Sequence, residues 1–368
     1  MSRVLARRGG AIWLEVALDG ATCPAVAYAG MVPALAVGDE VLVNTTAVDL
    51  GLGTGGWHFV VAAVGGVSGC GGGGSGGAGG ERESSAPGHV MKLRYTPLQV
   101  RCLCAEAPES PHHAALRDAR DIAGMTVVCG ELHSQLAPFA AALGALGGRR
   151  ARLVYVMTDG GALPAPFSHL LAELRERGLV AATVTAGHAF GGDIEAVNLY
   201  SGLLAARHVA AADIAFVGPG PGVVGTGTAF GTTALDQGLA VDAAATLGGR
   251  PVAALRIAFG DARPGHRGVS HHALTALGVV AHASAELAVP LLPPGPRSLV
   301  LEQLRAAPGM ARHRVVEADG APAARAMREM GLGVTSMGRD VDGEPALFQA
   351  AGAAAAVALR GVGSGAGV

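Results

Sequence analysis

The chain has 368 residues, of which 50% are hydrophobic and 4% aromatic, and its formal net charge is −2. Because aromatic residues are scarce and the lysines and arginines form no polybasic tract, we expect no nucleic acid and no membrane as a partner. Every apolar run is interrupted before it reaches the roughly 18–20 residues that span a bilayer. The first ten residues lack the apolar core of a secretion signal, which predicts a cytoplasmic protein.

Residues 1–105 are expected to form a small β-rich, barrel-like domain. Short runs rich in valine and leucine are separated by Gly, Asp, Pro and Asn turns, and they predict strands at 12–18, 25–29, 40–44, 57–62 and 92–104. Glycine dominates the stretch from 71 to 80, which buries too little apolar surface to order itself. A flexible glycine-rich loop is therefore predicted at 65–88.

After a connection at 106–124, residues 125–360 are expected to form an α/β domain. Strand-like runs alternate there with helix-like runs, which is the pattern of a parallel sheet flanked by helices. The predicted helices cover 167–174, 193–210, 234–247, 270–280, 296–306, 322–330 and 345–359. Residues 361–368 are predicted to be a disordered tail.

Six strand-like runs stop abruptly at short clusters of Gly, His, Asp and Glu. These runs cover 126–129, 153–157, 182–185, 214–217, 252–259 and 333–337. Open parallel sheets bind their ligands at the carboxyl ends of the strands. The pattern therefore predicts a small-molecule site at that edge of the sheet, without indicating which molecule binds.

Eight residues of these clusters are candidates for catalysis: Glu131, His133, Asp159, His188, Asp193, His266, His271 and His272. Histidines and carboxylates serve acid–base catalysis and metal coordination, so a divalent metal is a candidate cofactor. His188, Asp193 and Glu195 have the residue types of a metal site, but not the spacing of a known zinc motif. The alternative for each residue is structural, since Asp193 is a natural helix cap and Asp159 suits a turn.

A glycine-rich loop supplies the candidates for cofactor binding: Gly220, Gly222, Gly225, Thr226 and Gly227. The loop follows a strand and precedes a helix, so its backbone N–H groups could approach a phosphate. However, the loop continues beyond a tight dinucleotide turn, and Asp261 lies 36 residues past Gly225 rather than roughly 20. A dinucleotide site, a site for another anionic group and a structural loop all remain open.

Four stretches of sequence are distinctive in combination, at 44–59, 88–97, 185–193 and 266–272, the last reading His-Arg-Gly-Val-Ser-His-His. With them the chain resembles a bacterial family of conserved hypothetical proteins, catalogued as a domain of unknown function. The likeness covers nearly the whole chain apart from the glycine tract and the tail. It implies a soluble bacterial protein and no particular reaction.

The residue set is most typical of a small-molecule enzyme. We expect it to be hydrolase-like and metal-assisted, with an anionic ligand that Arg263, Arg267 or Arg339 could clamp. One alternative is a non-catalytic ligand- or nucleotide-binding protein that uses the same glycine-rich loop and cleft. Another is an assembly protein in which these residues only shape turns. The sequence leaves the oligomeric state open.

Overall fold

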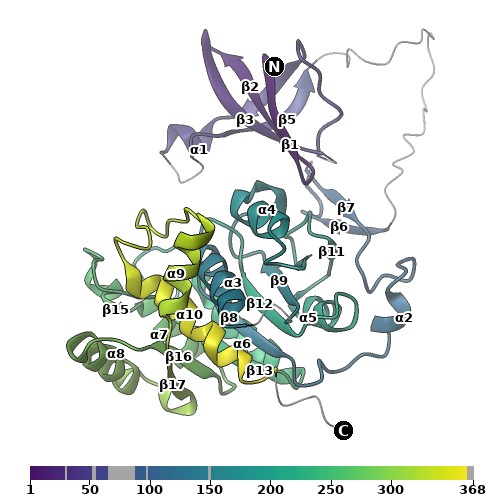
Figure 1. Ribbon diagram of the computed structural model, residues 1–368. Helices are drawn as coiled ribbons and strands as arrows, with labels where there is room; N and C mark the ends of the chain where they lie inside the picture. Colours follow the sequence, from purple (N-terminus) through teal and green to yellow (C-terminus); the bar gives the residue numbers. More distant parts are fainter. Residues whose placement is uncertain (30, 52–54, 65–87, 97, 148–150, 363–368) are drawn as a thin grey trace, which may run out of the picture. The chain divides into compact units, whose positions relative to one another are not determined.

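The computed structural model describes residues 1–362 apart from 30, 52–54, 65–87, 97 and 148–150. The chain divides into two compact units, Met1–Leu103 and Cys104–Val368 (Figure 1). The glycine-rich loop predicted at 65–88 lies, except for Gly88, outside the described residues, as does most of the predicted tail.

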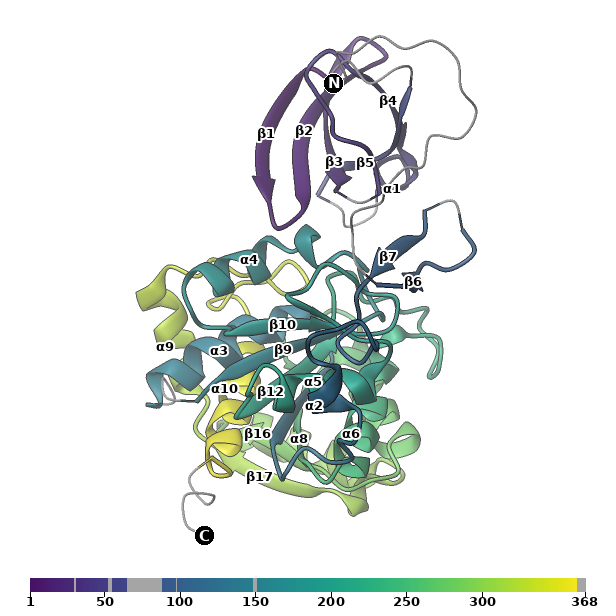
Figure 2. The same ribbon diagram turned by 90° about the vertical axis from the view of Figure 1, so that its right-hand side faces the viewer.

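Within its described residues, the first unit contains an open five-stranded sheet (Figure 2). The sheet has the order β1-β2-β3-β5-β4, built from β1 (Arg3–Arg8), β2 (Ala11–Leu18), β3 (Ala21–Tyr28), β4 (Glu40–Asn44) and β5 (His58–Val64). Strands β3 and β5 pair in parallel, and the other neighbours are antiparallel. Because β1 and β4 are free edges in this order, the predicted barrel-like closure is wrong.

The remaining elements of the first unit are short. A single strand was predicted at 92–104, but a two-stranded ribbon of β6 (Val90–Lys92) and β7 (Val100–Cys102) forms instead. The sequence pattern also missed β1, whose three arginines hide its alternation, and the single-turn helix α1 (Thr46–Asp49). The core of the sheet is made by inward-facing residues such as Leu14, Ala25 and Val60.

Within the described residues of the second unit, eight strands form a parallel sheet, which confirms the predicted α/β class (Figures 1 and 2). Its order is β11-β10-β9-β12-β8-β13-β16-β17. The strands are β8 (Thr126–Gly130), β9 (Leu153–Thr158), β10 (Ala182–Thr185), β11 (Ile194–Glu195), β12 (Ile214–Pro219), β13 (Arg250–Ala254), β16 (Glu286–Pro290) and β17 (Arg314–Ala318).

Two strand predictions need correction, and other strands of the sheet were not predicted. Residues 333–337 are not a strand, because Ser336 and Arg339 exchange backbone hydrogen bonds across a tight turn. The predicted run at 252–259 divides into β13 and the short β14 (Ile257–Ala258). Strands β16 and β17 were missed, since a charged residue begins each of them; Glu286 and Arg314 form an ion pair.

Helices cover both faces of this sheet (Figures 1 and 2). One face carries α3 (Leu136–Ala145), α4 (His169–Glu176), α9 (Ala321–Met330) and α10 (Pro345–Leu359). The other carries α5 (Leu199–His208), α6 (Asp236–Thr246), α7 (His271–Thr275) and α8 (Pro294–Ala306). Side chains alternate along a strand, so Val127 and Cys129 enter one core and Val128 the other. The short α2 (His113–Leu116) lies within the predicted connection.

The largest error at the start of a predicted helix concerns α5. Helix α5 begins at Leu199 instead of 193, and its cap is Asn198, whose side chain accepts a hydrogen bond from the N–H of Ser201 at 3.0 Å. Asp193 precedes β11 and accepts a hydrogen bond from the N–H of Thr183 at 2.7 Å. The physical reason is that this carboxylate already has a partner in the sheet, so it does not cap a helix.

The order of the strands reverses between β8 and β12. From β8 the chain runs outward through β9, β10 and β11, then returns to place β12 beside β8 and continues on the other side with β13. Connections leave β8 and β12 in opposite directions, which opens a crevice at the carboxyl ends of these strands. Glu131 follows β8, the glycine-rich loop follows β12, and Arg256 follows β13.

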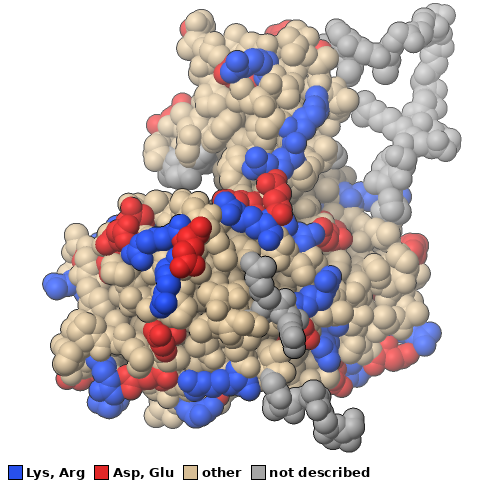
Figure 3. All heavy atoms as spheres, in the orientation of Figure 1, with Lys and Arg blue, Asp and Glu red and all other residues tan. Residues whose placement is uncertain are grey.

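Charges are interspersed on the face drawn in Figure 3, where basic and acidic side chains lie close to one another. Ion pairs among the described residues include Arg297 with Glu317 and Arg328 with Asp342. Among the described residues there is no helix with the length and hydropathy needed to cross a membrane.

Two glycines in helices differ in the space that surrounds their Cα atoms. A Cβ at Gly238 of α6 would overlap the carbonyl oxygen of Ala276, in the turn that continues α7. We predict that Gly238→Ala lowers the free energy of unfolding by about 1–3 kcal/mol, because overpacking outweighs the better helix propensity of alanine. In α3, a Cβ at Gly144 would meet only Leu179, at 3.9 Å. Gly144→Ala should therefore stabilise the protein by up to about 1 kcal/mol.

Urea unfolding of both variants measures these changes. Equal effects of the two substitutions would contradict the close packing of α6.

Candidate functional site

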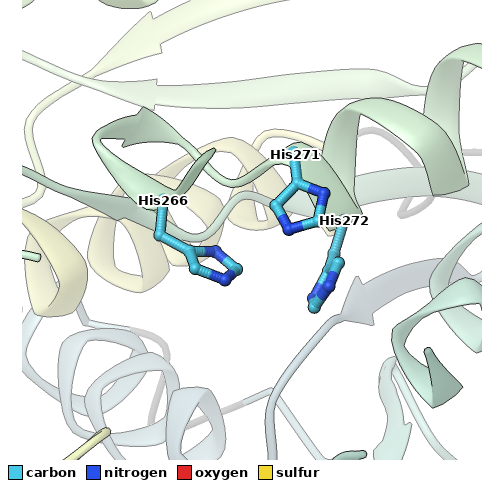
Figure 4. Close-up of side chains that lie close together, drawn as sticks. All are labelled: His266, His271 and His272. Carbon is cyan, nitrogen blue, oxygen red and sulfur yellow. The ribbon is translucent and has the colours of Figure 1, made fainter. Parts of the chain in front are cut away.

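Three histidines converge at the carboxyl edge of the sheet (Figure 4). His266 ends a short 3₁₀ turn (Pro264–His266), and His271 and His272 form the first turn of α7. One ring nitrogen of each residue lies within 4.8 Å of the others. Among the described residues, this is the one group of three His, Cys, Asp or Glu side chains that meets at such distances.

Local backbone structure accounts for this convergence. Strand β15 (Gly268–Val269) pairs antiparallel with β14, so the chain reverses direction between Ala258 and Gly268, in the segment that contains His266. Gly265 permits the close approach, because a Cβ there would lie 2.9 Å from Cδ2 of His271. Ser270 caps α7 by accepting a hydrogen bond from the N–H of His272 at 3.2 Å.

The Ser270 hydroxyl connects the histidines to a buried carboxylate. This fully buried hydroxyl donates to Oε1 of Glu131 at 3.2 Å, and Nδ1 of His266 lies 3.2 Å from the same hydroxyl. With its proton directed to Glu131, Ser270 accepts from Nδ1–H of His266, which leaves Nε2 of His266 with its lone pair. In a catalytic triad the histidine lies between serine and carboxylate. Here the serine lies between them, so Ser270 positions its neighbours and is not a nucleophile.

Glu131 lies at the centre of this polar cluster. Its side chain is fully buried at the end of β8, 3.9 Å from Nδ1 of His272 and 3.8 Å from Nη1 of Arg256. Burial raises the pKa of Glu131 to about 7, against the opposing effects of Arg256 and Ser270. Three buried atoms of this cluster have no hydrogen-bond partner in the described residues: Oε2 of Glu131, Nε2 of His272 and Nε of Arg256.

All three imidazoles are neutral near neutral pH. Desolvation lowers the pKa of His266 and His272 to about 4, with the arginines and neighbouring histidines adding to the effect. Desolvation, followed by the charge of Arg256, also lowers the pKa of His271. Neutral imidazoles retain the lone pair that a metal ligand or a general base requires.

The histidines line a cavity of about 640 Å³. Arg256 and Arg263 add positive charge to its wall, and Leu132, Val223 and Met337 make the wall partly apolar. Glycines complete it: Gly225, Gly227 and Gly265. A Cβ at Gly225 would come within 2.8 Å of Cε1 of His272, so this position of the loop needs a glycine.

Asp261 orders the arginines beside the cavity. Its carboxylate accepts hydrogen bonds from Arg263 at 2.9 Å, Arg339 at 2.8 Å and Arg256 at 3.2 Å. The bonds from Arg263, with those from Arg339, hold the pKa of Asp261 well below its usual range. Asp261 is therefore a permanent anion that orients cations, and it is not an acid–base group at neutral pH.

The family described as "Protein of unknown function (DUF3866)" matches residues 24–355. The chain belongs to this family. The match covers every residue of the site just described. No curated protein and no solved structure matches the chain.

The structure divides the eight predicted catalytic residues of this family member into separate environments. Glu131, His266, His271 and His272 come together. His133 is buried instead between Tyr155, at 3.0 Å from its Nδ1, and Ser168, at 2.7 Å from its Nε2.

The other three predicted residues, and Glu195, have partners away from the histidine cluster. Asp159 accepts a hydrogen bond from the N–H of His188, and Asp193 pairs with Arg175 at 2.9 Å. Glu195 accepts from Thr185 at 2.7 Å and from the N–H of Gly191 at 2.6 Å. None of these residues lines the cavity of about 640 Å³.

The glycine-rich loop that contains Gly220, Gly225 and Gly227 folds back on itself as a hairpin. Gly225 pairs with Thr232, and the N–H of Thr226 donates to the carbonyl of Gly231 at 2.8 Å. Gly225 and Gly227 reach the cavity, whereas Gly220 packs against Ala162. Helix α6 begins at Asp236, so a carboxylate occupies the helix end that would face a phosphate in a dinucleotide fold.

The sequence patterns did not indicate that Arg256, Leu132 and Met337 line the site. Arg256 was hidden inside the run at 252–259, which was predicted to be one strand. A charged residue in an otherwise apolar run was the available signal, because an arginine is seldom buried without a partner. Leu132 and Met337 gave no signal, since an apolar residue near a strand end suits the core equally well.

The burial of His133 generates a stability prediction. Desolvation lowers its pKa from 6.5 to about 4, so between these values the unfolded chain holds a proton that the native state excludes. The native state should thus lose about 3 kcal/mol from this residue as the pH falls from 6.5 to 4, with no further loss below that range.

His133→Gln removes this component. The difference in free energy of unfolding between wild type and variant should therefore fall by about 3 kcal/mol from neutral pH to about pH 4. Urea unfolding across this range measures it, and parallel pH profiles of the two proteins would contradict the burial of a neutral His133.

Proposed function

We propose that this protein is a metal-dependent hydrolase that acts on a small anionic substrate. His266, His271 and His272 hold a divalent ion, and the crevice beside β8 and β12 holds the substrate. The observation that carries this proposal is the convergence of three neutral imidazoles, within 4.8 Å, in one cavity of about 640 Å³.

The donor set favours a transition metal. Imidazole nitrogen suits Zn²⁺ and its neighbours in the first transition row, whereas Mg²⁺ and Ca²⁺ prefer oxygen. Catalytic zinc sites keep three protein ligands and one open position, with Zn–N distances of about 2.0–2.1 Å. The three nitrogens lie within 4.8 Å of one another, and the side chains would close on the ion to reach such distances.

The groups behind the histidines support the same assignment. Metal-binding histidines usually have the second ring nitrogen hydrogen-bonded to a carboxylate or another polar group, which fixes the tautomer. Ser270 fills this role for His266, at 3.2 Å from Nδ1. Nδ1 of His272 faces Thr232 at 3.5 Å and Glu131 at 3.9 Å. Glu131 thereby supports His266 through Ser270, and it lies near His272 without a hydrogen bond between them.

Hydrolysis follows from what such a centre supplies. A bound divalent ion lowers the pKa of water and polarises the bond under attack. Around it, the protein keeps the histidines neutral and oriented, and Arg256 and Arg263 attract the anionic part of the substrate. The location at a reversal of strand order is also where open α/β sheets bind ligands.

Isothermal titration of the full chain with Zn²⁺, after EDTA treatment and dialysis, tests metal binding. We predict one tight equivalent for the wild type. His271→Ala should weaken binding by at least about 100-fold, because the loss of outer partners alone costs about 10–100-fold. His282→Ala, at an exposed histidine outside the cavity, is the matched control and should bind as the wild type does.

Turnover separates an enzyme from a binding protein. With Zn²⁺, Co²⁺ or Mn²⁺ present, chromogenic phosphate and carboxylate esters should be hydrolysed by the wild type and not by His271→Ala. Tight metal binding without turnover of any ester would favour the non-catalytic alternative. Equal zinc affinity in wild type and His271→Ala would refute the metal centre itself.

A further inference from the structure

The charges on the cavity wall are all of one sign. Of the residues that line it, only Arg256 and Arg263 carry a formal charge when the histidines are neutral. Asp261 is almost fully buried behind them and does not line the cavity. A ligand that enters therefore meets two cations and no carboxylate, which favours an anionic group.

Both guanidinium groups have an N–H donor that can bind an anionic group of the ligand. Arg263 uses Nε and Nη2 for a bidentate pair with Asp261, at 3.0 and 2.9 Å, and Nη1 lies outside this pair. Arg256 is only 3% exposed, and its buried Nε has no hydrogen-bond partner within the described residues. A buried donor without a partner is costly, so a ligand that accepts from it gains affinity. Guanidinium groups match the geometry of phosphate and carboxylate oxygens.

Another part of the lining is apolar and includes a residue in an unusual backbone conformation. Met337 has φ of +52° and is followed by Gly338 with φ of +76°, inside the turn closed by Ser336 and Arg339. Two positive φ angles in succession are the pattern of a type I′ turn, which favours Asn and Gly. A methionine there is strained, and strain of this kind concentrates at functional sites. Its side chain is half exposed and lines the cavity together with Leu132 and Val223.

We propose that the substrate is an amphipathic oxyanion. Its phosphate-like or carboxylate group binds Arg263 and Arg256, and an apolar substituent packs against Leu132, Val223 and Met337. A cavity of about 640 Å³ accommodates a molecule of this size. The inference rests on the proposed function for the reaction, but the binding it describes needs no metal.

Titration calorimetry of the EDTA-treated full chain tests it with two matched pairs of probes. Methylphosphonate and phenylphosphonate form one pair, and acetate and phenylacetate form the other. The phenyl member of a pair should bind at least about tenfold more tightly than its small partner, because each apolar contact in a pocket contributes about tenfold or more. The pair that binds identifies the head group as phosphate-like or carboxylate.

Three variants assign the contacts. Arg263→Gln should weaken both members of the binding pair about tenfold or more, whereas Arg305→Gln, at an exposed arginine on α8, should leave both unchanged. Met337→Asn should remove the advantage of the phenyl group without affecting the small anion. Because asparagine suits the turn, the same variant should raise the melting temperature by about 2 °C.

The inference is overturned if no probe binds, if the phenyl and small members bind equally, or if Arg263→Gln behaves as Arg305→Gln. Failure of the metal centre would not produce these outcomes, because the titration contains no metal. Anion binding without zinc binding would contradict the proposed metal-dependent hydrolase. It would still support an amphipathic anionic ligand.

Discussion

A parallel sheet that is covered on both faces has little room for polar side chains along its strands. In the second unit, residues such as Val127, Val128 and Val156 are fully buried in one of two apolar cores. Polar functional side chains can therefore lie outside the two apolar cores only where the strands end. The site, with Glu131 after β8 and Arg256 after β13, follows from that constraint, and the reversal of strand order at β8 and β12 selects where on the edge it forms.

Buried amides hold the strand ends together at this point. The side chain of Gln135 accepts from the N–H groups of Glu131 and Leu132 at 2.8 and 2.9 Å, and donates to the carbonyls of Ala254 and Leu255. Gln237 donates to the carbonyls of Cys129 and Ala254. These bonds fix the end of β8 against the end of β13. Glu131 and Arg256 therefore face each other on a rigid support, and the histidines pack on that support through Ser270.

Much of the fold followed from sequence periodicity. The alternation of strand-like and helix-like runs predicted the α/β class, and strand 182–185 and helix 345–359 were predicted with the bounds that the structure has. Strands β16 and β17 were missed because charged residues interrupt short runs. The open sheet of the first unit was mistaken for a barrel, since closure depends on which edges pair and single strands carry no signal of that.

The sequence predicted part of the site. Residues at strand ends were expected to converge, and Glu131, His266, His271 and His272 do so. His133 lies two residues after Glu131, yet Tyr155 and Ser168 bind both of its ring nitrogens away from the cavity. Strand-end position limits a side chain to one edge of the sheet. It does not fix the direction in which the side chain points, which depends on partners distant in the sequence.

Anomalous diffraction from crystals grown with Zn²⁺ locates the ion without an assumed reaction. A metal centre formed by the three histidines predicts one strong peak about 2.0–2.1 Å from a ring nitrogen of each of His266, His271 and His272. Zinc found only at exposed histidines, with no peak among these three residues, would contradict it.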